Sequence, residues 1–309
     1  MDLVPSTAIS DVDGERNRII VRGRDLADLA GKISYEEMWE LVVGQSAAEL
    51  GVARAEVSDW FTPRRNLAST IAEFVSNEPI LLTAVIAVAA AGGKKPDASR
   101  SHAADFVRRA TGSDDRQRAT AFEVYLVTMA ENGLNTSTYA ARIVASTGAS
   151  LHFSVVAALC ALEGPLHGGA PVPVLEMLEE IGSPDRAEAW VKARLEAGER
   201  IPGIGHRVFK GRDPRAGILE RAAATLPVAR RLETARAVER AVAARAKPLF
   251  ANVELYTAVL LDAVGLPKEL FTPAFAIARV AGWCAHVAEQ RATGRLIQPN
   301  ARYIGPSPA

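Results

Sequence analysis

The chain has 309 residues, of which 49% are hydrophobic and 23% charged, the ordinary range of globular proteins. Its 36 basic and 36 acidic residues balance and form no block of like charge, which argues against a nucleic-acid partner. The two cysteines, Cys160 and Cys284, lie in apolar segments without CxxC spacing, so we expect two buried thiols in a reducing compartment and no metal or redox role.

The predicted elements begin with a small β-hairpin. Thr7–Ser10 and Ile19–Arg22 are typical of its two strands, with an Asp-Gly pair near the turn. Ser34 comes next, and Glu37 three residues later gives a capping-box pattern in front of apolar residues, which predicts the start of a helix. No later segment alternates apolar and polar residues persuasively. The predicted fold class is therefore mainly α.

Two apolar segments raise the question of a membrane helix. Ile80–Ala91 has about half the length that a bilayer span requires. Ile143–Leu162 has twenty residues without Asp, Glu, Lys or Arg, but it contains His152 and is typical of wholly buried helices in a large core. The first fourteen residues have no basic region followed by an apolar one, so no secretory signal is expected. We expect a cytoplasmic protein that does not contact a membrane.

Two glycine-rich segments, Gly164–Gly169 and Gly203–Gly211, interrupt helical sequence, and each carries a histidine. His167 lies where glycines let a ligand approach the backbone closely. His206 is followed by a basic run, a pattern that indicates an acid or electrophile beside an anion site. Either loop alone is equally consistent with a capped turn around a satisfied histidine. The two together favour a site.

Four further titratable residues have less distinctive surroundings. His102 and His152 stand alone among helix-forming residues, and His286 lies three residues after Trp283, so structural roles are expected for all three. Glu254 opens an apolar helix. Taken alone, Glu254 is typical of a carboxylate favoured by the helix dipole, and a buried general base is the alternative.

Six segments, in the same order and at about the same spacing, resemble the citrate synthase family. They include the N-terminal STAISDVDG, followed by ENGLNTSTYAARIVASTGA, GPLHGGA, GIGHRVFKGRDPRA, NVELYTAVLLDAVGLP and FAIARVAGWCAHVAEQ. The match extends over nearly the whole chain, although residues 51–115 are compressed and weakly matched. No flexible linker is found, so a second domain must be inserted into the first. The resemblance implies a two-domain helical fold in which residues 1–168 and 259–309 form a large, dimer-forming domain and residues 169–258 a small domain that closes over the site.

The resemblance also implies a reaction, the condensation of acetyl-CoA or another short acyl-CoA with a 2-oxo acid such as oxaloacetate, the chemistry of the tricarboxylic acid cycle, followed by thioester hydrolysis. Glu254 matches the base that removes a proton from the acyl methyl group. His167 matches the histidine that stabilises the enol, and His206 the one that donates to the ketone of the second substrate. Arg215 and Arg279 match the arginines that hold its carboxylates.

The coenzyme A side of the site is implied in the same way. Lys210 falls where the family has a basic residue against coenzyme A phosphates, and Gly203 and Gly205 belong to the same segment. The resemblance implies a homodimer. The sequence shows no metal cluster and no nucleotide-binding glycine signature, so we expect no metal and no cofactor beyond the acyl-CoA thioester.

Three positions depart from the family pattern. Asn132 stands where the family usually has a histidine that binds oxaloacetate, and Gln298 stands at the arginine that crosses the dimer interface to a substrate carboxylate. Losing that charge-assisted contact removes roughly 1.5–3 kcal/mol. Glu254 replaces an aspartate and lengthens the base by one methylene. We expect an acceptor other than oxaloacetate, with fewer carboxylates.

Two alternatives remain open at this point. A lyase that cleaves a citryl-CoA-like thioester would use the same residues in the reverse direction. A non-catalytic or regulatory relative would explain three altered pocket positions together, but it has little reason to keep both histidine loops with Lys210, Arg215 and Arg279.

Overall fold

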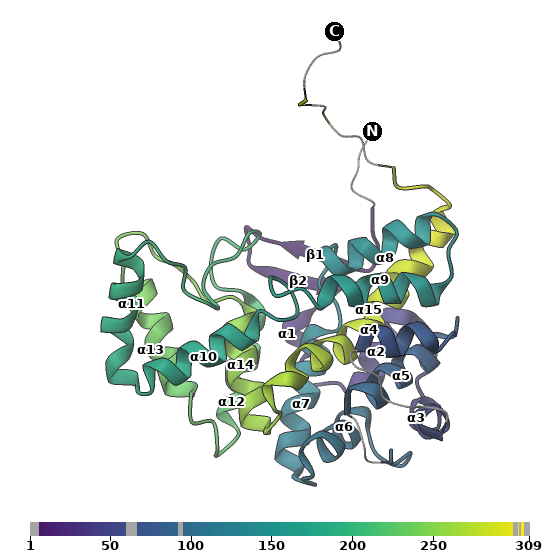
Figure 1. Ribbon diagram of the computed structural model, residues 1–309, viewed down its shortest axis with the longest axis horizontal. Coiled ribbons are helices and arrows are strands. Elements are labelled where there is room, and N and C mark those ends of the chain that lie inside the picture. The colour runs from purple at the N-terminus through teal and green to yellow at the C-terminus, as the bar shows by residue number, and fades with distance from the viewer. Residues whose placement is uncertain (1–5, 60–66, 92–94, 299–301, 303, 306–309) are drawn as a thin grey trace.

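The computed structural model of the chain describes residues 6–59, 67–91, 95–298, 302 and 304–305. Helices follow one another along these residues, and a small sheet lies near the N-terminus, so the predicted mainly α class is confirmed (Figure 1). The elements before the first glycine-rich loop are β1 (Ser10–Asp13), β2 (Arg18–Val21), β3 (Arg24–Asp25), α1 (Leu26–Leu29), α2 (Tyr35–Val43), α3 (Leu50–Asp59), α4 (Leu67–Glu73), α5 (Pro79–Ala91), α6 (His102–Thr111), α7 (Arg116–Met129), α8 (Thr136–Ser146) and α9 (Leu151–Leu162). The elements after it are α10 (Pro171–Ile181), the 3-10 turn η1 (Pro184–Arg186), α11 (Ala187–Glu196), α12 (Pro214–Ala224), α13 (Leu232–Ala243), α14 (Val253–Val264), the 3-10 turn η2 (Lys268–Leu270) and α15 (Phe271–Thr293).

The N-terminal hairpin forms, but its first strand lies further along the chain than predicted. β1 pairs antiparallel with β2 and places Ser10 opposite Val21, so the prediction of a strand at Thr7–Ser10 was wrong. The turn fixes this register, because the carboxylate of Asp13 accepts hydrogen bonds from the backbone N–H groups two and three residues ahead, at 3.0 and 2.9 Å. Asn17 closes the turn with a φ of +50°.

The capping box predicted at Ser34 is present. The Ser34 side chain accepts a hydrogen bond from the backbone N–H of Glu37, and the Glu37 carboxylate accepts one from the backbone N–H of Ser34 at 2.7 Å. The helix that follows, α2, buries Met38 and Trp39 in the core and ends at Gly44. A reciprocal cap of this kind satisfies two backbone donors at the start of the helix.

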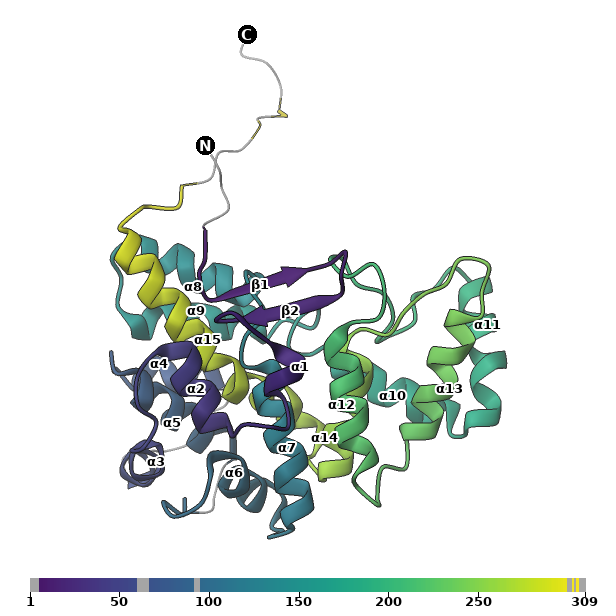
Figure 2. The same ribbon diagram turned by 180° about the vertical axis from the view of Figure 1, so that it is seen from behind.

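Helix α15 runs through the core and packs against α2, α5, α7, α8 and α9 (Figures 1 and 2). The segment Lys268–Thr293 is long and apolar enough to cross a membrane by length and composition, but 83% of its apolar window is buried by the other helices, as in the core helix of a globular protein. Gly282 lets α15 approach the segment after α7, because a Cβ there would lie 2.3 Å from the Glu131 carboxylate. This close approach positions Arg279, one turn earlier on α15.

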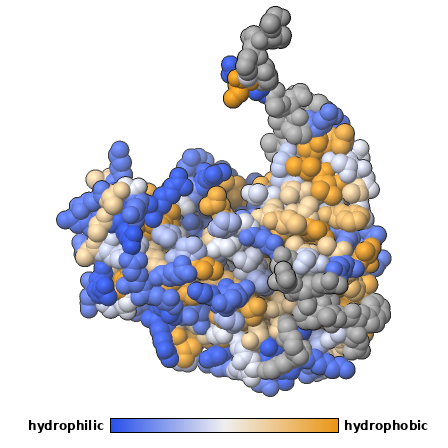
Figure 3. Space-filling model, viewed as in Figure 1, coloured by the Kyte–Doolittle hydropathy of each residue, from blue (hydrophilic) through white to orange (hydrophobic). Residues whose placement is uncertain are grey.

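Helices α8 and α9 pack against each other and against α15, but they are not wholly buried as predicted for Ile143–Leu162. One stripe of the pair stays partly exposed, including Val144 and Phe153, which is 58% exposed. Cys160 lies on the same stripe and is exposed, so the prediction of a buried thiol is wrong for Cys160 and confirmed for Cys284. In Figure 3 an apolar patch covers this part of the surface. The run is apolar on all sides, but the helices pack against each other and against α15, and the stripe turned away from these contacts is left partly exposed.

Helices α10 to α13 lie to one side of the larger body, and α12 and α14 both pack against α7, which belongs to that body (Figures 1 and 2). Helix α14 packs against α12 and α10 on one side and α7 on the other. The predicted domain boundary at residue 258 falls inside α14, which is one continuous helix. The division into residues 1–168 with 259–309 and residues 169–258 stays a prediction.

Candidate active site

The segment that carries His206 is paired with the chain just before α14. The backbone N–H of Asn252 donates to the carbonyl oxygen of Gly203 at 2.9 Å, and its side-chain amide donates to that of Gly205, also at 2.9 Å. Gly203 has a φ of +77°, and a Cβ there would lie 3.0 Å from the Cα of Leu255. Only glycine combines this conformation with such a close approach. The pairing brings His206 to the N-terminal end of α14.

The ring of His206 has a defined proton position. Its Nδ1 accepts hydrogen bonds from the backbone N–H groups of Val208 and Phe209, each at 3.0 Å. Because both partners are donors, the neutral imidazole must carry its proton on Nε2. Partial burial lowers the pKa of His206, and Arg215 acts in the same direction while Asp213 opposes it. The ring is therefore a neutral Nε2–H donor at neutral pH.

Asp213, which we did not predict from the sequence, forms hydrogen bonds both to α12 and to the start of α14. It is buried and caps α12, with Oδ1 accepting from the backbone N–H of Arg215 at 3.0 Å. Its carboxylate also holds the Arg215 guanidinium through Nε at 3.0 Å and Nη2 at 2.7 Å. Oδ2 accepts the backbone N–H of Val253, the first residue of α14, at 3.2 Å. The Asp-Pro pair in front of a helix is a typical capping signal and could have indicated it.

Glu254 follows on the first turn of α14, as predicted. Its Oε2 is buried and has no hydrogen-bond partner among the residues that the structure describes. Burial raises the pKa of Glu254 to about 7, against the positive charges of Arg215 and Arg279, which lower it, while Asp213 raises it further. A carboxyl group with this pKa is half ionised near neutral pH, which suits a general base.

His167 lies in a tight turn after α9 and faces two other helices. Its Nε2 lies 2.9 Å from the hydroxyl oxygen of Ser137 at the start of α8, and its ring meets Phe275 of α15 edge-on at 5.6 Å. Ser137 Oγ also accepts from Trp283 Nε1 at 3.2 Å. Burial, aided by the charge of Arg279, lowers the pKa of His167 to about 4. The imidazole is neutral at physiological pH.

Like Arg215, Arg279 is a buried cation of the site. Its Nε donates to the carbonyl oxygen of Met129 at the end of α7 at 2.6 Å, and its guanidinium lies over the ring of Phe275 at 4.9 Å. Its Nη2 is buried without a partner among the described residues, and so is the hydroxyl of Tyr125, one turn before Met129. The charges of Arg279 and Glu254 act on each other and on Tyr125, so these side chains share one region. Tyr125 carries no motif that would have indicated it from sequence.

Asn132 lies on the segment that connects α7 to α8, and its Oδ1 is buried without a partner among the described residues. The residue before it, Glu131, accepts hydrogen bonds from Ser10 at 2.7 Å and from His286 Nε2 at 3.0 Å. His286 Nδ1 lies 3.0 Å from Arg142, which as a permanent donor fixes the His286 proton on Nε2. His286 therefore has the structural role that was expected, because it bonds to Glu131, the residue next to Asn132 in the chain.

His102 and His152 are also fully buried away from this cluster, in agreement with their expected structural roles. The imidazole Nδ1 of His102 lies 3.2 Å from Arg54, in a buried group of charges near α6. Among the described residues no three His, Cys, Asp or Glu side chains gather as metal ligands would.

Two predicted site residues lie apart from the buried cluster. Lys210 is exposed, and its backbone N–H donates to Gly14 of the hairpin turn at 3.1 Å. Gln298 is exposed, and the backbone N–H of its neighbour Ile297 donates to Ser146, at the opposite end of α8 from the His167 contact. Nine residues of helix separate the two ends by about 14 Å. Within one chain the structure does not bring Gln298 to the other candidates.

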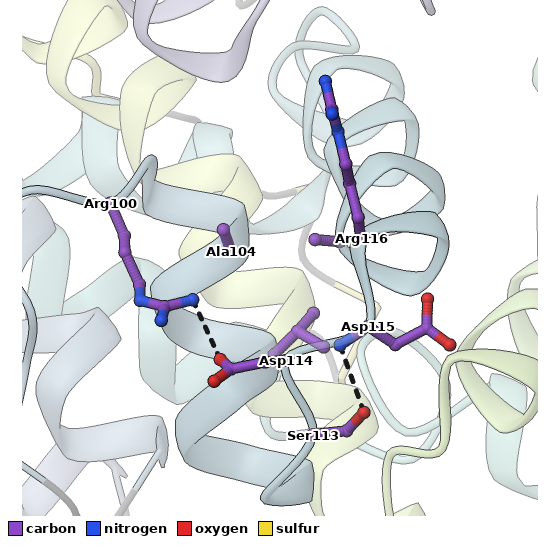
Figure 4. A pocket seen from close by; sticks show the side chains of 8 residues that line it. Arg100, Ala104, Ser113, Asp114, Asp115 and Arg116 are labelled. Atoms are coloured by element: carbon purple, nitrogen blue, oxygen red, sulfur yellow. Dashed lines mark hydrogen bonds and ion pairs between the residues drawn. The ribbon is translucent and has the colours of Figure 1, made fainter.

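A small pocket lies between α6 and α7 but is separate from the site (Figure 4). Its charged groups pair with each other, Arg100 with Asp114 at 2.8 Å, and Ser113 accepts the backbone N–H of Asp115 at 3.2 Å. It lies at the start of α7, whereas Met129 lies at the end, about 20 Å along the helix. We assign this pocket no role in the chemistry.

Comparison with known proteins places the chain in a family. The family model "Citrate synthase, C-terminal domain" matches residues 49–300. A citrate synthase of Haloferax volcanii is 32% identical over 357 residues, which cover 98% of this chain and 94% of the relative.

Solved structures agree with this match. The citrate synthase of Thermotoga maritima MSB8 superimposes with a TM-score of 0.88 at 31% identity and covers 99% of this chain and 94% of that one. The citrate synthase of Thermoplasma acidophilum, solved as a ternary complex with carboxymethyl coenzyme A and oxaloacetate, has a TM-score of 0.87 over 99% of this chain and 95% of that one, and at 23% identity it shows the fold alone. The chain belongs to the citrate synthase family and is an acyltransferase of that kind.

Proposed function

We propose that the protein condenses a short acyl-CoA, such as acetyl-CoA, with a 2-oxo acid through an enol intermediate and then hydrolyses the thioester. The observation that carries this proposal is the state of Glu254, whose buried Oε2 has no partner among the described residues and whose pKa is raised to about 7 by burial. A carboxylate of this kind accepts a carbon-bound proton more readily than a solvated one, because no hydrogen bond must be broken and its basicity is higher.

Proton removal from the acyl methyl group leaves negative charge on the thioester oxygen, which needs a donor in place. His167 supplies it as a neutral imidazole. The hydroxyl of Ser137 lies within reach of both His167 Nε2 and Asn135 Oδ1, at 2.9 and 2.8 Å. When that hydroxyl donates to Nε2, the imidazole proton lies on Nδ1, and Nδ1–H is the donor for the enol oxygen.

Carbon–carbon bond formation then involves His206. The enol carbon attacks the ketone carbon of the 2-oxo acid, and the ketone oxygen takes a proton as it becomes a hydroxyl group. His206 presents Nε2–H for this transfer, because its Nδ1 is held by two backbone N–H donors, and the proton that Glu254 took from the methyl group replaces the one that His206 gives up. Water then hydrolyses the thioester, releasing the free thiol of coenzyme A and a carboxylate.

Substrate binding follows from the charges around these groups. We assign the carboxylate of the 2-oxo acid to Arg215 and Arg279, and the coenzyme A portion to Lys210 with the backbone at Gly203 and Gly205. The reaction as written needs no metal and no cofactor, because hydrogen-bond donors stabilise the enol and the thioester is consumed as a substrate.

The acceptor is the part of this proposal that departs from the relatives. Asn132 is neutral, and Gln298 supplies no positive charge from a second subunit. An acceptor with a second carboxylate, such as oxaloacetate, would lose the bidentate contact expected there. We infer a 2-oxo acid with fewer carboxylates, whose remaining polar group hydrogen-bonds to the buried amide of Asn132.

We also infer a homodimer and a cytoplasmic location. The partly exposed apolar stripe of α8 and α9 supports the dimer, because a second copy of the same surface would remove Val144 and Phe153 from water. Both cysteines are free thiols, in keeping with a reducing compartment.

A thiol-release assay tests the proposed reaction. Purified protein is mixed with acetyl-CoA or propionyl-CoA and a panel of 2-oxo acids that includes oxaloacetate, and free coenzyme A is followed with time. We expect release with at least one acid, slowed at least about 100-fold but still measurable in Glu254→Gln and His206→Asn. No release with any acid, despite measurable coenzyme A binding, would contradict the proposal. Oxaloacetate as the best acceptor would contradict the inference about Asn132 and Gln298.

A further inference from the structure

The tip of the N-terminal hairpin contacts the loop that carries His206, although the two are separated by nearly 200 residues. The carbonyl oxygen of Gly14 accepts the backbone N–H of Lys210 at 3.1 Å, and the side-chain oxygen of Asn17 accepts that of Gly211 at 2.9 Å. A Cβ at Gly14 would lie 2.2 Å from the carbonyl oxygen of Val208, so the two backbones are in close contact.

These bonds complete a pattern over four consecutive backbone N–H groups. Those of Val208 and Phe209 donate to His206 Nδ1, and the next two, Lys210 and Gly211, donate to the hairpin. Neighbouring peptide planes share a Cα, so the orientation of one limits the next. The hairpin therefore fixes the part of the loop whose N–H groups hold the imidazole.

The base of the hairpin is anchored on the opposite side of the site. Ser10 in β1 donates to the carboxylate of Glu131 at 2.7 Å, and its oxygen accepts the backbone N–H of Gly133 at 3.0 Å. A Cβ at Gly133 would meet Val12 at 3.1 Å. The hairpin thus spans from the segment that bears Asn132 to the loop after His206.

The exposure of the loop makes this support necessary. His206 and Val208 are exposed in the chain, whereas Phe209 is buried and packs its ring 4.6 Å from the imidazole. We propose that the hairpin tip, through Asn17 and the close contact at Gly14, positions His206 for proton donation to the acceptor ketone. Asn17 acts through the loop and is a positioning residue.

The inference rests on the proposed role of His206, but its first test does not depend on activity. Arg207 and Lys210 are exposed trypsin sites within the supported loop. Asn17→Gly removes the side-chain acceptor, and glycine tolerates the positive φ at this position. We expect the rate of tryptic cleavage after these residues, measured by mass spectrometry, to rise about 5-fold, which corresponds to the net free energy of one hydrogen bond. Asn17→Asp keeps an acceptor oxygen and should restore the wild-type rate. Arg16→Ala is the matched control, because Arg16 lies in the same turn and its side chain pairs, among the described residues, with Asp13 of that turn. Unchanged cleavage in Asn17→Gly would overturn the inference.

The second test asks whether the support reaches the imidazole. Histidine NMR titration, with His206→Asn to assign the signal, should show the pKa of His206 rising toward its ordinary value in Asn17→Gly, because a loosened loop gives water more access to the ring and so reduces the burial that lowers its pKa. With the best acceptor from the thiol assay, kcat should fall about 5-fold in Asn17→Gly, and the same change in a His206→Asn background should have no further effect. A loss that is equal in both backgrounds, or an unmoved His206 pKa, would overturn the inference. If the wild-type enzyme releases no thiol with any acid, the proposed function fails, and the cleavage and NMR results still decide the role of the hairpin.

Discussion

Replacing Glu254 with glutamine should slow the reaction at least about 100-fold and make the protein increasingly more stable than wild type as the pH rises above about 4.5. The reason is that the folded state holds the Glu254 carboxylate in a buried position where Oε2 has no partner among the described residues. Glutamine has nearly the same shape and no charge to desolvate. A base of this kind typically contributes at least about 100-fold to the rate, so kcat should fall by that factor or more.

The stability change follows from the pKa. Burial raises the pKa of Glu254 from 4.5 to about 7, which corresponds to about 3 kcal/mol as an upper limit. Because the folded pKa lies above the unfolded one, the full stability is present below the unfolded value and is lost as the pH rises through about 7. The free energy of unfolding of Glu254→Gln should therefore match wild type near pH 4.5 and exceed it increasingly up to about pH 8.

Urea unfolding at a series of pH values measures this difference. Glu123→Gln is a matched control, because burial also raises the pKa of Glu123 to about 7 but its carboxylate accepts the backbone N–H of Tyr35 at 2.6 Å, away from the site. It should show a similar stability gain with rising pH, because its pKa is raised by about the same amount, and unchanged kcat, because it lies outside the site. If Glu254→Gln is less stable than wild type at pH 8, or its advantage does not vary with pH, Glu254 is hydrogen-bonded or solvated in solution and the reasoning about the base is wrong.

The remaining predictions concern the surroundings of the base. In wild type, kcat/KM should rise through about pH 7 as Glu254 ionises, and a pH profile flat from pH 6 to pH 8 would contradict this. Asn132→His combined with Gln298→Arg should recover oxaloacetate use in the thiol assay, whereas no gain would count against the account of the acceptor pocket. Tyr125→Phe should not lower the melting temperature, because the Tyr125 hydroxyl has no partner among the described residues. Tyr35→Phe should lower the free energy of unfolding by about 1 kcal/mol, because it removes the hydrogen bond from the Tyr35 hydroxyl to a backbone carbonyl of α15 at 2.7 Å. Equal losses of stability in the two variants would contradict this prediction.

The sequence was sufficient for the parts of the site that depend on local pattern. Glycine-rich loops around His167 and His206, and the position of Glu254 on the first turn of a helix, follow from residue type and spacing, and the structure agrees with them. The mainly α class follows from helix caps such as the one at Ser34. The family resemblance added the roles, because spacing alone did not distinguish a general base at Glu254 from a carboxylate that only favours the helix N-terminus.

What the sequence did not predict depends on contacts between distant segments. From the sequence, Tyr125 cannot be distinguished from other core aromatic residues. Its place in the site depends on the packing of α14 and α15, which carry Glu254 and Arg279. Asn17 looks like a turn residue, and its bond to Gly211 exists only because the hairpin reaches across the site. The exposed position of Cys160 could not be read from an apolar run, since hydrophobicity indicates that a surface is covered but not whether the same chain covers it.

The pairing of Asp213 with Arg215 has a consequence for ion selectivity. Asp213 already accepts hydrogen bonds from two nitrogens of the Arg215 guanidinium. An incoming carboxylate must therefore replace Asp213 as the partner of Arg215, because this guanidinium is already paired. Weakly coordinating anions such as chloride cannot match the two-point geometry of a carboxylate and gain little from the exchange. Arg215 should therefore discriminate against simple inorganic anions, and its contribution to binding the 2-oxo acid should be less sensitive to added chloride than that of Arg279, whose Nη2 has no partner among the described residues.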